Sequence, residues 1–216
     1  MNKIDFTVLI PVFNTKAAEL IEAVFSVHHT NQTIDQEYDI LIVDDGSTDP
    51  STGHALEFLK IAFDRVKVLH LPVNMGTPVA LNRGHAEIKT EWVAIMGSSD
   101  ISLEGRFKLQ VEHLLANPDI DVLGTNLMSF AESDPYRRQI YRSSHGYHTT
   151  LQERSEGWLT NHGTAMYKLS SVNYVNGYDE KKRRYQDVDL WKRMDKAGKK
   201  IRTLAPVTYL WRKANV

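Results

Sequence analysis

The sequence predicts an α/β protein built on an open, mostly parallel twisted sheet with helices on both faces. Short, β-branched and almost wholly apolar runs alternate with segments of helical spacing through the first half of the chain. Strands of this kind are covered on both faces, as in parallel sheets with helical crossovers. A polar turn follows each apolar run, at the sheet edge where such folds bind ligands. The predicted class is therefore Rossmann-like, with a smaller irregular region after it.

The first expected unit is strand 6–13 followed by helix 17–29. The strand reads FTVLIPVF, which is short, apolar and rich in β-branched residues. The helix carries one apolar side, formed by residues that recur at helical spacing: Leu20, Ile21, Val24, Phe25 and His28.

The second unit pairs strand 38–45, YDILIVDD, with helix 49–63. Asp49 or Ser51 is expected near the N-cap of that helix, because short polar side chains accept hydrogen bonds from the first-turn N–H groups. Strand 66–71, VKVLHL, follows. These segments continue the strand–helix alternation of a parallel sheet.

Helix 77–88 completes the third unit and has Pro78 in its first turn, where the missing N–H costs little. The fourth unit is strand 91–97, EWVAIMG, and helix 103–118, which stops at Pro118. All eight elements of the first half thus follow from apolar periodicity and helix-end signals.

The second half is less regular. Residues 121–130 and 162–169 are expected to be strands, and 186–198 an amphipathic helix. The polar segment 131–157 is expected to be a long loop, and loops of that length in compact domains are functional or mobile. One or two closing strands are expected within 201–211.

Composition excludes several classes of protein. Among 216 residues there are 27 acids and 26 bases, so the net charge of −1 gives no support for bulk nucleic-acid binding. The absence of cysteine excludes disulfides, thiolate catalysis and Cys-ligated zinc, and favours the reducing cytosol. No run of about 18 apolar residues could span a bilayer, and no signal peptide is visible. The expected location is cytoplasmic, without a transmembrane segment.

Polar residues gather after the four predicted strands of the first half, as PVFN, DDGSTD, PVNMGT and GSSD. All four stretches could line one crevice. Asp44 and Asp45 are adjacent, so in extended chain they point to opposite sides. Either acid could accept hydrogen bonds from a ribose hydroxyl or a base N–H, or the pair could cap its turn with Ser47 and Asp49.

Two helix N-termini carry further candidates. Gly76 precedes helix 77–88, and a helix N-terminus of this kind suits phosphate because its N–H groups and dipole favour anions. Asp187 and Asp189 lie in the first turn of helix 186–198. They could simply complement the helix dipole, or Asp187 could project into the crevice as a general base for a hydroxyl nucleophile.

Several stretches in order resemble the family 2 glycosyltransferases of the GT-A fold: VLIPVFN, LIVDDGSTD, NMGTPVALNRG, EWVAIMGSSDISLEGRF, HGTAMYK, GYDEKKRRYQDVDLWKRM and the terminal YLWRKANV. The resemblance covers nearly the whole chain. It implies an inverting, nucleotide-sugar-dependent hexosyltransferase. It also implies a single catalytic domain over 1–216, with a nucleotide-binding half, 1–118, and an acceptor and catalytic-base half, 119–216.

The resemblance also implies roles for individual residues. Asp187 matches the catalytic base of the family. Nucleotide-binding positions would be Pro11, Phe13, Asn14, Asp45, Asn74, Gly76, Asn82 and Ser99. The acceptor and sugar side would include His162, Gly163, Thr164 and Trp191. The expected donor is a UDP-sugar, and in most relatives a divalent cation, Mn²⁺ or Mg²⁺, neutralises the leaving diphosphate.

The chain departs from the family pattern at two places. The family carries Asp-x-Asp-Asp after its fourth strand, whereas residues 97–100 read GSSD, with Ser99 at the usual metal-ligating position. Gln186 stands where the family has glutamate before the base. Asp100 could still hold a cation with the help of substrate phosphates, or Arg184 and Arg212 could neutralise the diphosphate without metal. Alternatively, the protein is an inactive nucleotide-sugar-binding module.

The acceptor hydroxyl stays open between a saccharide, a lipid, a protein and a modified nucleic acid. The segment 131–157 is where acceptor recognition is expected, and a partner chain or a second copy could complete that site. A signalling receiver domain is a third hypothesis, because ILIVDD also resembles the paired acids of receivers. Receivers carry that run at their first strand, whereas strand 6–13 precedes it here.

Overall fold

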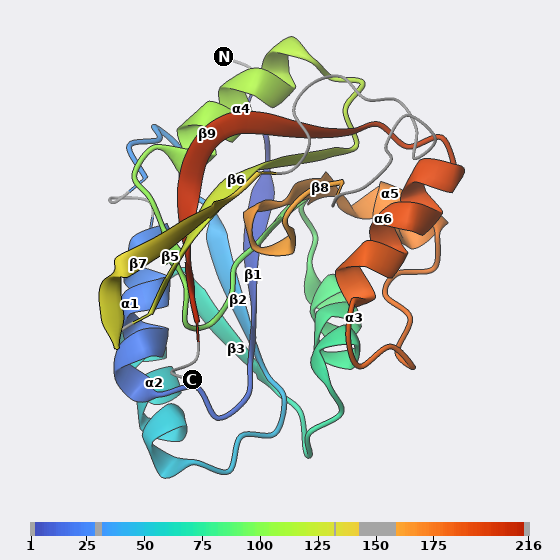
Figure 1. Cartoon of the computed structure of the whole chain (residues 1–216). Coiled ribbons are helices and arrows are strands. Elements are labelled where there is room, and N and C mark those ends of the chain that lie inside the picture. The colour runs from blue at the N-terminus through green and yellow to red at the C-terminus, as the bar shows by residue number, and fades with distance from the viewer. Residues whose placement is uncertain (1–2, 29–31, 132, 143–158, 214–216) are drawn as a thin grey trace.

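The computed structural model describes residues 3–28, 32–131, 133–142 and 159–213. The described residues form one continuous curved sheet of nine strands (Figure 1). In spatial order the strands are β3 (Val66–His70), β2 (Asp39–Asp44), β1 (Phe6–Val12), β4 (Trp92–Ile95), β8 (Met166–Lys168), β6 (Val122–Ala131), β9 (Ile201–Arg212) and β5 (Ile101–Ser102), and β7 (Asp134–Tyr141) pairs with β6. The sheet therefore joins both halves of the sequence.

The sheet has a parallel part and a mixed part. Strands β3, β2, β1 and β4 run parallel to one another, as the alternation of strands and helices predicts. Beyond β4, strand β8 is antiparallel to both β4 and β6, whereas β6 and β9 are parallel. Antiparallel β5 and β7 complete the edges of this second part. The irregular half of the sequence thus extends the same sheet.

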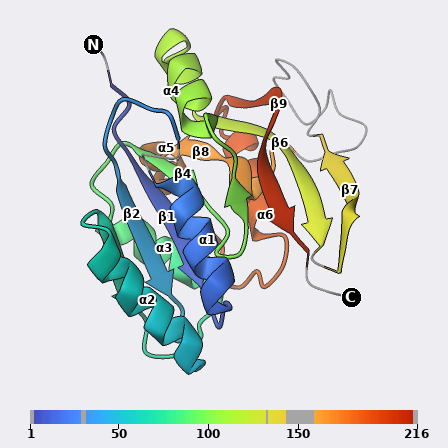
Figure 2. The ribbon, with the colours of Figure 1, turned by 90° about the vertical axis from the view of Figure 1, so that its left-hand side faces the viewer.

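Helices cover both faces of the sheet. Figure 2 shows α1 (Ala17–Val27) and α2 (Pro50–Ala62) side by side over β1 and β2, with α4 (Arg106–Ala116) on the same side. The other face carries α3 (Thr77–Glu87), α5 (Leu169–Tyr174) and α6 (Gln186–Lys196), grouped in Figure 1. Among the described residues, none of the helices is long and apolar enough to cross a membrane.

Strand β1 is nearly all apolar because it is covered on both faces, and its one polar side chain, Thr7, is hydrogen-bonded to the Thr90 hydroxyl at 2.9 Å. Val8 and Ile10 belong to the core cluster that also contains α1, α2 and α4 residues. Leu9, between them, belongs to the second cluster, which also holds Leu81 of α3 and Leu190 of α6. Because successive side chains of a strand point to opposite faces, a strand covered on both faces needs no polar positions. This confirms the predicted α/β class.

The structure confirms the type and order of all eight elements predicted in the first half. Asp49 is the N-cap of α2, and its carboxylate accepts a hydrogen bond from the Ser51 N–H at 2.8 Å. Of the residues predicted to share one side of α1, Phe25 is 43% exposed and packs edge-on against Phe63. Ala23 and Val27 are buried in its place, because α1 packs against α2 as well as the sheet.

The second half contains three corrections. Within the predicted loop 131–157, residues 134–141 form β7, which pairs with β6, and 143–158 lie outside the described residues. The predicted strand 162–169 is a short 3₁₀ turn, His162–Thr164, followed by the three-residue β8. Helix α5 then starts at Leu169 and has no clear apolar period. The closing segment was predicted to form one or two strands, and it forms the single strand β9, which pairs with β6 on one side and with β5 on the other.

Candidate active site

A pocket of about 620 Å³ lies where β1 and β4 end and where β6 and β9 pass beside them. Its wall comes from segments far apart in the chain: Pro11, Thr77, Ile95, Met96, Gly97, Ser98, Ser99, Asp100, Leu127, Tyr141, Asn161, His162, Gly163, Gln186, Asp187, Tyr209 and Trp211. Six of the predicted site residues are in that wall: Pro11, Ser99, Asp100, His162, Gly163 and Asp187. The carboxyl ends of parallel strands therefore deliver the site, as expected.

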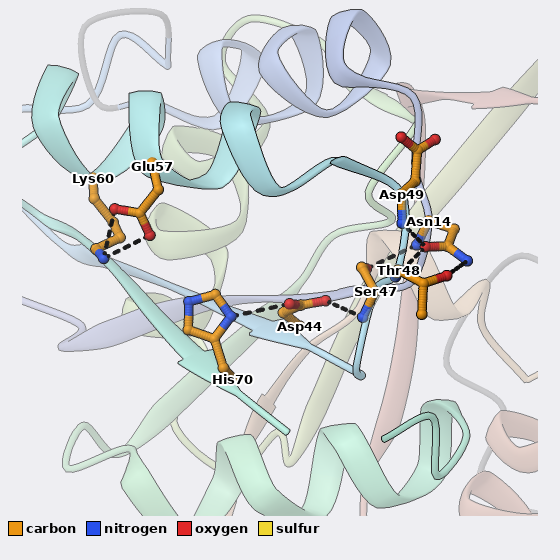
Figure 3. A network of polar contacts seen from close by, with 8 residues as sticks. All are labelled: Asn14, Asp44, Ser47, Thr48, Asp49, Glu57, Lys60 and His70. Carbon is orange, nitrogen blue, oxygen red and sulfur yellow. Dashed lines mark hydrogen bonds and ion pairs between the residues drawn. The ribbon is translucent and has the colours of Figure 1, made fainter. Parts of the chain in front are cut away.

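Asn14 organises the turn after β2 (Figure 3). Its side-chain oxygen accepts hydrogen bonds from the N–H groups of Thr48 at 2.8 Å and Asp49 at 3.0 Å. Its own backbone N–H donates to the Ser47 hydroxyl at 2.9 Å. Asn14 has a positive φ of 49°, a conformation that asparagine tolerates better than most residues. Its visible contacts thus join the turns that follow β1 and β2.

Asp44 and Asp45 do point in different directions, and each secures a different loop. Asp44 accepts the Ser47 N–H at 3.0 Å and contacts Nδ1 of His70 at 3.0 Å (Figure 3). Asp45 is buried, and its two carboxylate oxygens accept the N–H groups of Met75 and Gly76, each at 2.8 Å. The turn-capping interpretation therefore describes Asp44. Asp45 clamps the loop that leads into α3.

Gly76 has a backbone conformation that only glycine adopts easily, with φ of 96°. A Cβ atom there would lie 2.3 Å from the Nη1 atom of Arg183, which donates to the Met75 carbonyl at 3.0 Å. The arginine thus lies directly over the start of α3. Arg184, the predicted diphosphate neutraliser, is an exposed neighbour outside the pocket wall. Both arginines belong to the KKRR run, and Arg183 is the one that contacts this loop.

Asp100 is almost fully buried at the floor of the pocket. The Tyr209 hydroxyl donates to its Oδ2 at 2.7 Å, and the backbone N–H of Arg212 donates to Oδ1 at 2.9 Å. The Gly97 N–H in turn donates to the Tyr209 oxygen at 2.9 Å. Burial raises the pKa of Asp100, and the hydrogen bonds from Tyr209 and Arg212 offset part of that rise. The last strand therefore holds the acid of the GSSD stretch.

The two arginines near Asp100 are engaged in the wall itself. The Arg212 side chain donates from Nε to the Ser99 carbonyl at 2.7 Å, pairs with Glu22 and lies over the Phe130 ring. Arg106 is completely buried below, and it donates to the Ile95 carbonyl at 2.9 Å. Desolvation lowers the pKa of Arg106 to about 10, so the side chain stays cationic at neutral pH. Arg212 thus supports the loop that contains Ser99.

Helix α6 begins at Gln186 after Tyr185, whose φ of 56° turns the chain sharply into the helix. Of the two acids in its first turn, Asp189 pairs with Arg193 at 2.8 Å. Arg193 also donates to the Gly177 carbonyl at 2.8 Å, so this pair fixes the helix to the preceding loop. Asp187 lies in the pocket wall instead. The sequence singled out Asp187 as the candidate base, and the surroundings of the two acids differ accordingly.

The HGT segment forms the wall beside Asp187. His162 contacts the Tyr178 hydroxyl through Nε2 at 2.7 Å, and a Cβ atom at Gly163 would lie 2.6 Å from the Tyr209 hydroxyl oxygen. Thr164 and Trp191, which were predicted on the sugar side, are buried behind the wall. Thr164 hydrogen-bonds both backbone groups of a β6 residue, and the Trp191 ring belongs to the second core cluster. Both therefore support the wall from the core side.

The remaining predicted nucleotide residues lie around the pocket without lining it. Asn82 donates to the Tyr178 carbonyl and accepts the Tyr178 N–H, both at 2.9 Å, so it fastens the loop before α6 to α3. Phe13, 46% exposed, and Asn74 are surface residues on the loops after β1 and β3. Their predicted roles in nucleotide binding are untested by these contacts.

Several residues of the pocket wall were not predicted as site residues, although the resemblance includes the terminal run YLWRKANV and the predictions include Arg212 of β9. Tyr209 and Trp211 come from β9, Tyr141 from β7, and Asn161 directly precedes the HGT motif. Tyr209 and Trp211 alternate with Leu210, which is the period of a strand with one face in a site, and that pattern could have identified them. Nothing local distinguishes Asn161, whereas Tyr141 lies within the segment 131–157, where acceptor recognition was expected.

Comparisons with known proteins show the family to which this fold belongs. Residues 7–176 match glycosyl transferase family 2, and the chain belongs to this family. The pre-mycofactocin glycosyltransferase of Mycobacterium tuberculosis (strain H37Rv) is 29% identical over 92% of this chain and 40% of its own length. The chain spans between 40% and 67% of the lengths of the first curated relatives.

Solved structures confirm the fold. Staphylococcus aureus TarS 1–349 in complex with UDP-GlcNAc has a TM-score of 0.74 at 18% identity, covering 98% of this chain and 59% of TarS 1–349. The mannosyltransferase PcManGT from Pyrobaculum calidifontis, in complex with GDP-Man and Mn²⁺, has a TM-score of 0.71 at 14% identity. It covers 99% of this chain and 58% of that protein. The chain therefore has the GT-A fold of the family.

Proposed function

We propose that the chain transfers a hexose from a UDP-sugar to an acceptor hydroxyl with inversion, with Asp187 as the general base. The observation that carries this proposal is the position of Asp187. It lines the pocket at the ends of the parallel strands, while its neighbour Asp189 is paired with Arg193. A UDP-sugar is proposed because TarS, one of the structurally similar proteins, was solved with UDP and with UDP-GlcNAc.

In the proposed reaction, the acceptor oxygen attacks the anomeric carbon from the side opposite the diphosphate. The acceptor proton passes to a carboxylate oxygen of Asp187 as the new C–O bond forms. The bond from the anomeric carbon to the phosphate oxygen breaks, and the nucleoside diphosphate leaves with the bonding pair. A single displacement of this kind inverts the anomeric centre. The transition state has oxocarbenium character, as in glycosidases.

The wall residues fit a divalent cation with one protein carboxylate. The donors are hard oxygens: Asp100 and the hydroxyls of Ser98 and Ser99. A Cβ atom at Gly97 would lie 2.2 Å from Oδ2 of Asp100, so only glycine leaves room beside that oxygen. Within the described residues, no group of three or more His, Cys, Asp or Glu could hold a metal. A bound Mn²⁺ or Mg²⁺ would supply positive charge for the leaving diphosphate, with most of its ligands from phosphate and water.

The first test replaces the proposed base. Asp187→Asn should lower kcat by about 10²- to 10⁴-fold with UDP affinity nearly unchanged, because the amide cannot accept the acceptor proton. The measurement is release of UDP from a panel of UDP-sugars, with calorimetry for UDP binding. Asp189→Asn is the matched control and should retain most of the activity. The proposal is wrong if Asp187→Asn turns over as fast as wild type.

The inactive binding module remains the second candidate, and the reduced acid content of GSSD favours it. Such a module would bind a nucleotide or a nucleotide sugar in calorimetry. It would neither transfer the sugar nor hydrolyse the donor slowly. In that case, Asp187→Asn would leave every measured property unchanged, so the same variants separate the two functions.

The metal assignment has its own test. Addition of EDTA should abolish activity, and Mn²⁺ or Mg²⁺ should restore it. Asp100→Asn should raise the metal concentration needed for half-maximal rate by about tenfold or more, because one charged ligand is lost. The exposed acid Asp119, which pairs with Lys200, offers the matched control Asp119→Asn. Activity that survives EDTA would instead indicate that basic side chains neutralise the leaving diphosphate. Arg183 would then be the first residue to substitute.

A further inference from the structure

Four ring side chains form a chain of contacts behind the pocket wall. Nε2 of His85 lies 2.8 Å from the Tyr167 hydroxyl, which lies 3.5 Å from the Tyr178 hydroxyl. The Tyr178 hydroxyl lies 2.7 Å from Nε2 of His162, which reaches the pocket. The first three residues are buried and come from α3, β8 and the loop before α6. The chain therefore connects the core to the wall beside Asp187.

The number of protons limits how this chain can be hydrogen-bonded. The three contacts need one hydrogen each if all are hydrogen bonds. The two tyrosine hydroxyls supply only two of these hydrogens. One histidine must therefore carry its proton on Nε2. If His85 does, every hydrogen bond points toward His162, and Tyr178 donates to Nε2 of His162. If His162 does, every bond points the other way.

The surroundings of His85, at the buried end of these contacts, decide between the two directions. Nδ1 of His85 is buried and has no hydrogen-bond partner among the described residues. A buried N–H without an acceptor is rarer in proteins than an unpaired acceptor. The proton of His85 therefore belongs on Nε2, where it is hydrogen-bonded to Tyr167. It follows that His162 receives a hydrogen bond at Nε2.

We propose that His85, Tyr167 and Tyr178 are positioning residues that hold His162 as a neutral imidazole with its proton on Nδ1. Because Nε2 is occupied, Nδ1 is the ring nitrogen left for a ligand in the pocket. His162 thus offers an N–H donor to an oxygen of the bound substrate, next to the proposed base Asp187. This choice of ligand, an oxygen of the sugar donor or its acceptor, rests on the proposed function.

The charges around His162 agree with a neutral ring. Burial lowers the pKa of His162, and the Asp187 carboxylate on α6 opposes this shift. From the other elements, Tyr178 and Tyr167 present hydroxyls whose pKa values burial raises, so both remain protonated. Burial lowers the pKa of His85 to about 4, and the nearby His162 adds to that shift.

Other ionisable groups lie further along the same wall. Asp100 and Tyr209 face the same pocket, and Arg193 acts on Tyr178 from α6. A neutral His162 leaves the negative charge of Asp187 available for the acceptor proton. A protonated His162 would instead stabilise the carboxylate and make Asp187 a weaker base. The contacts from His85 to His162 therefore affect the proposed role of Asp187 as well as the packing of the core.

The test is the tautomer of His162, read from two-dimensional ¹H–¹⁵N spectra of the whole chain labelled with ¹⁵N-histidine. His162→Gln assigns the signals by their disappearance. We expect wild-type His162 to show a protonated Nδ1 and an unprotonated Nε2 near neutral pH. A protonated Nε2 would overturn the proposal. This measurement requires no turnover, so it stands even where the proposed transferase activity fails.

Two variants test whether the contacts that run from His85 to His162 set the tautomer of His162. Tyr178→Phe should shift the His162 tautomer toward Nε2–H and raise its titration midpoint by roughly one pH unit, because the neutral ring loses its donor. Tyr167→Phe should move the same signals less, and it serves as the second variant where Tyr178→Phe does not fold. Exposed Tyr174 provides the control Tyr174→Phe, which should move none of them. Unchanged His162 signals in both chain variants would overturn the proposal.

In active enzyme, Tyr178→Phe should also move the acid limb of the kcat/KM profile to higher pH. Tyr174→Phe should leave the profile in place. An unchanged acid limb in Tyr178→Phe would contradict the proposed influence of the chain on Asp187. A loss of folding alone would lower the amount of active enzyme without moving the limb.

Discussion

Identical residue types have very different surroundings in this site. Asp45 and Asp100 are both buried, but backbone N–H groups of the α3 loop satisfy the first, and a tyrosine and a β9 amide satisfy the second. Asp187 lines the pocket, whereas Asp189 is bound to Arg193. The partner of each carboxylate therefore distinguishes supporting acids from the candidate base.

The buried histidine His85 predicts an acid-sensitive fold. Its pKa falls from 6.5 to about 4 on folding, so the unfolded chain takes up this proton first as the pH drops. The stabilisation is complete above pH 6.5 and is lost as the pH falls toward 4. The loss from this residue is about 3 kcal/mol.

Urea unfolding of wild type and His85→Gln between pH 7.5 and 4 measures this contribution. The wild-type free energy of unfolding should fall more steeply with acid than that of the variant. The exposed histidine His54 provides the control, and His54→Gln should keep the wild-type slope. Parallel curves for wild type and His85→Gln would contradict the prediction.

Among the elements, the turn between β2 and α2 depends on a residue outside it. Asn14 holds two N–H groups of the turn with one side-chain oxygen and adopts a positive φ itself. Asn14→Ala should destabilise the fold by about 1–2 kcal/mol through lost hydrogen bonds and backbone strain. Asn14→Gly should cost less, because glycine relieves the strain, and Asn14→Asp should cost least.

Urea unfolding of the three variants checks this order, and calorimetry with UDP checks the site. The UDP affinity should follow the same order, because the turns after β1 and β2 border the proposed nucleotide site. An Ala variant as stable as the Asp variant would contradict the role given to the amide oxygen.

The elements also show which features sequence can predict. Strands covered on both faces and helices with one apolar side carry their structure in local periodicity, so the units of the first half were predicted correctly. Strand β7 is polar, and the three-residue β8 is too short for any period. Their conformations depend on pairing with β6, which lies outside their own sequence.

The residues of the candidate site were likewise predicted only in part. Pro11, Ser99, Asp100, His162, Gly163 and Asp187 were predicted and lie in the wall. Tyr209 and Trp211 were not predicted as site residues. Their alternation indicates only that they share one face of a strand, and the sheet order, which brings β9 beside β6, decides what that face meets. Asn82 was assigned to the nucleotide, but its visible contacts are with the loop before α6. Motif position predicts proximity to a site better than it predicts the partner of a side chain.

For the whole molecule, ligand binding should stabilise a fold whose pocket joins both parts of the sheet. UDP at 100 times its dissociation constant should add about 2.7 kcal/mol of stability. For a chain of this length, that corresponds to a rise in Tm of about 5–11 °C. GDP at the same concentration should give a smaller rise, because the proposed donor is a UDP-sugar. A thermal melt with each nucleotide, with and without Mn²⁺, makes the measurement, and a larger rise with GDP would contradict the donor assignment.

The hydrogen bonds that secure Asp100 span 109 and 112 residues of the chain. During synthesis, a ribosome-bound chain that has emerged only through α4 contains the GSSD acid but neither of its β9 donors. The carboxylate must stay hydrated until residues 209–212 have emerged. Contacts of such long sequence separation form slowly, since loop closure precedes them. The parallel half of the sheet can thus assemble while translation continues, and the proposed sugar-transfer site is completed only after β9 has emerged.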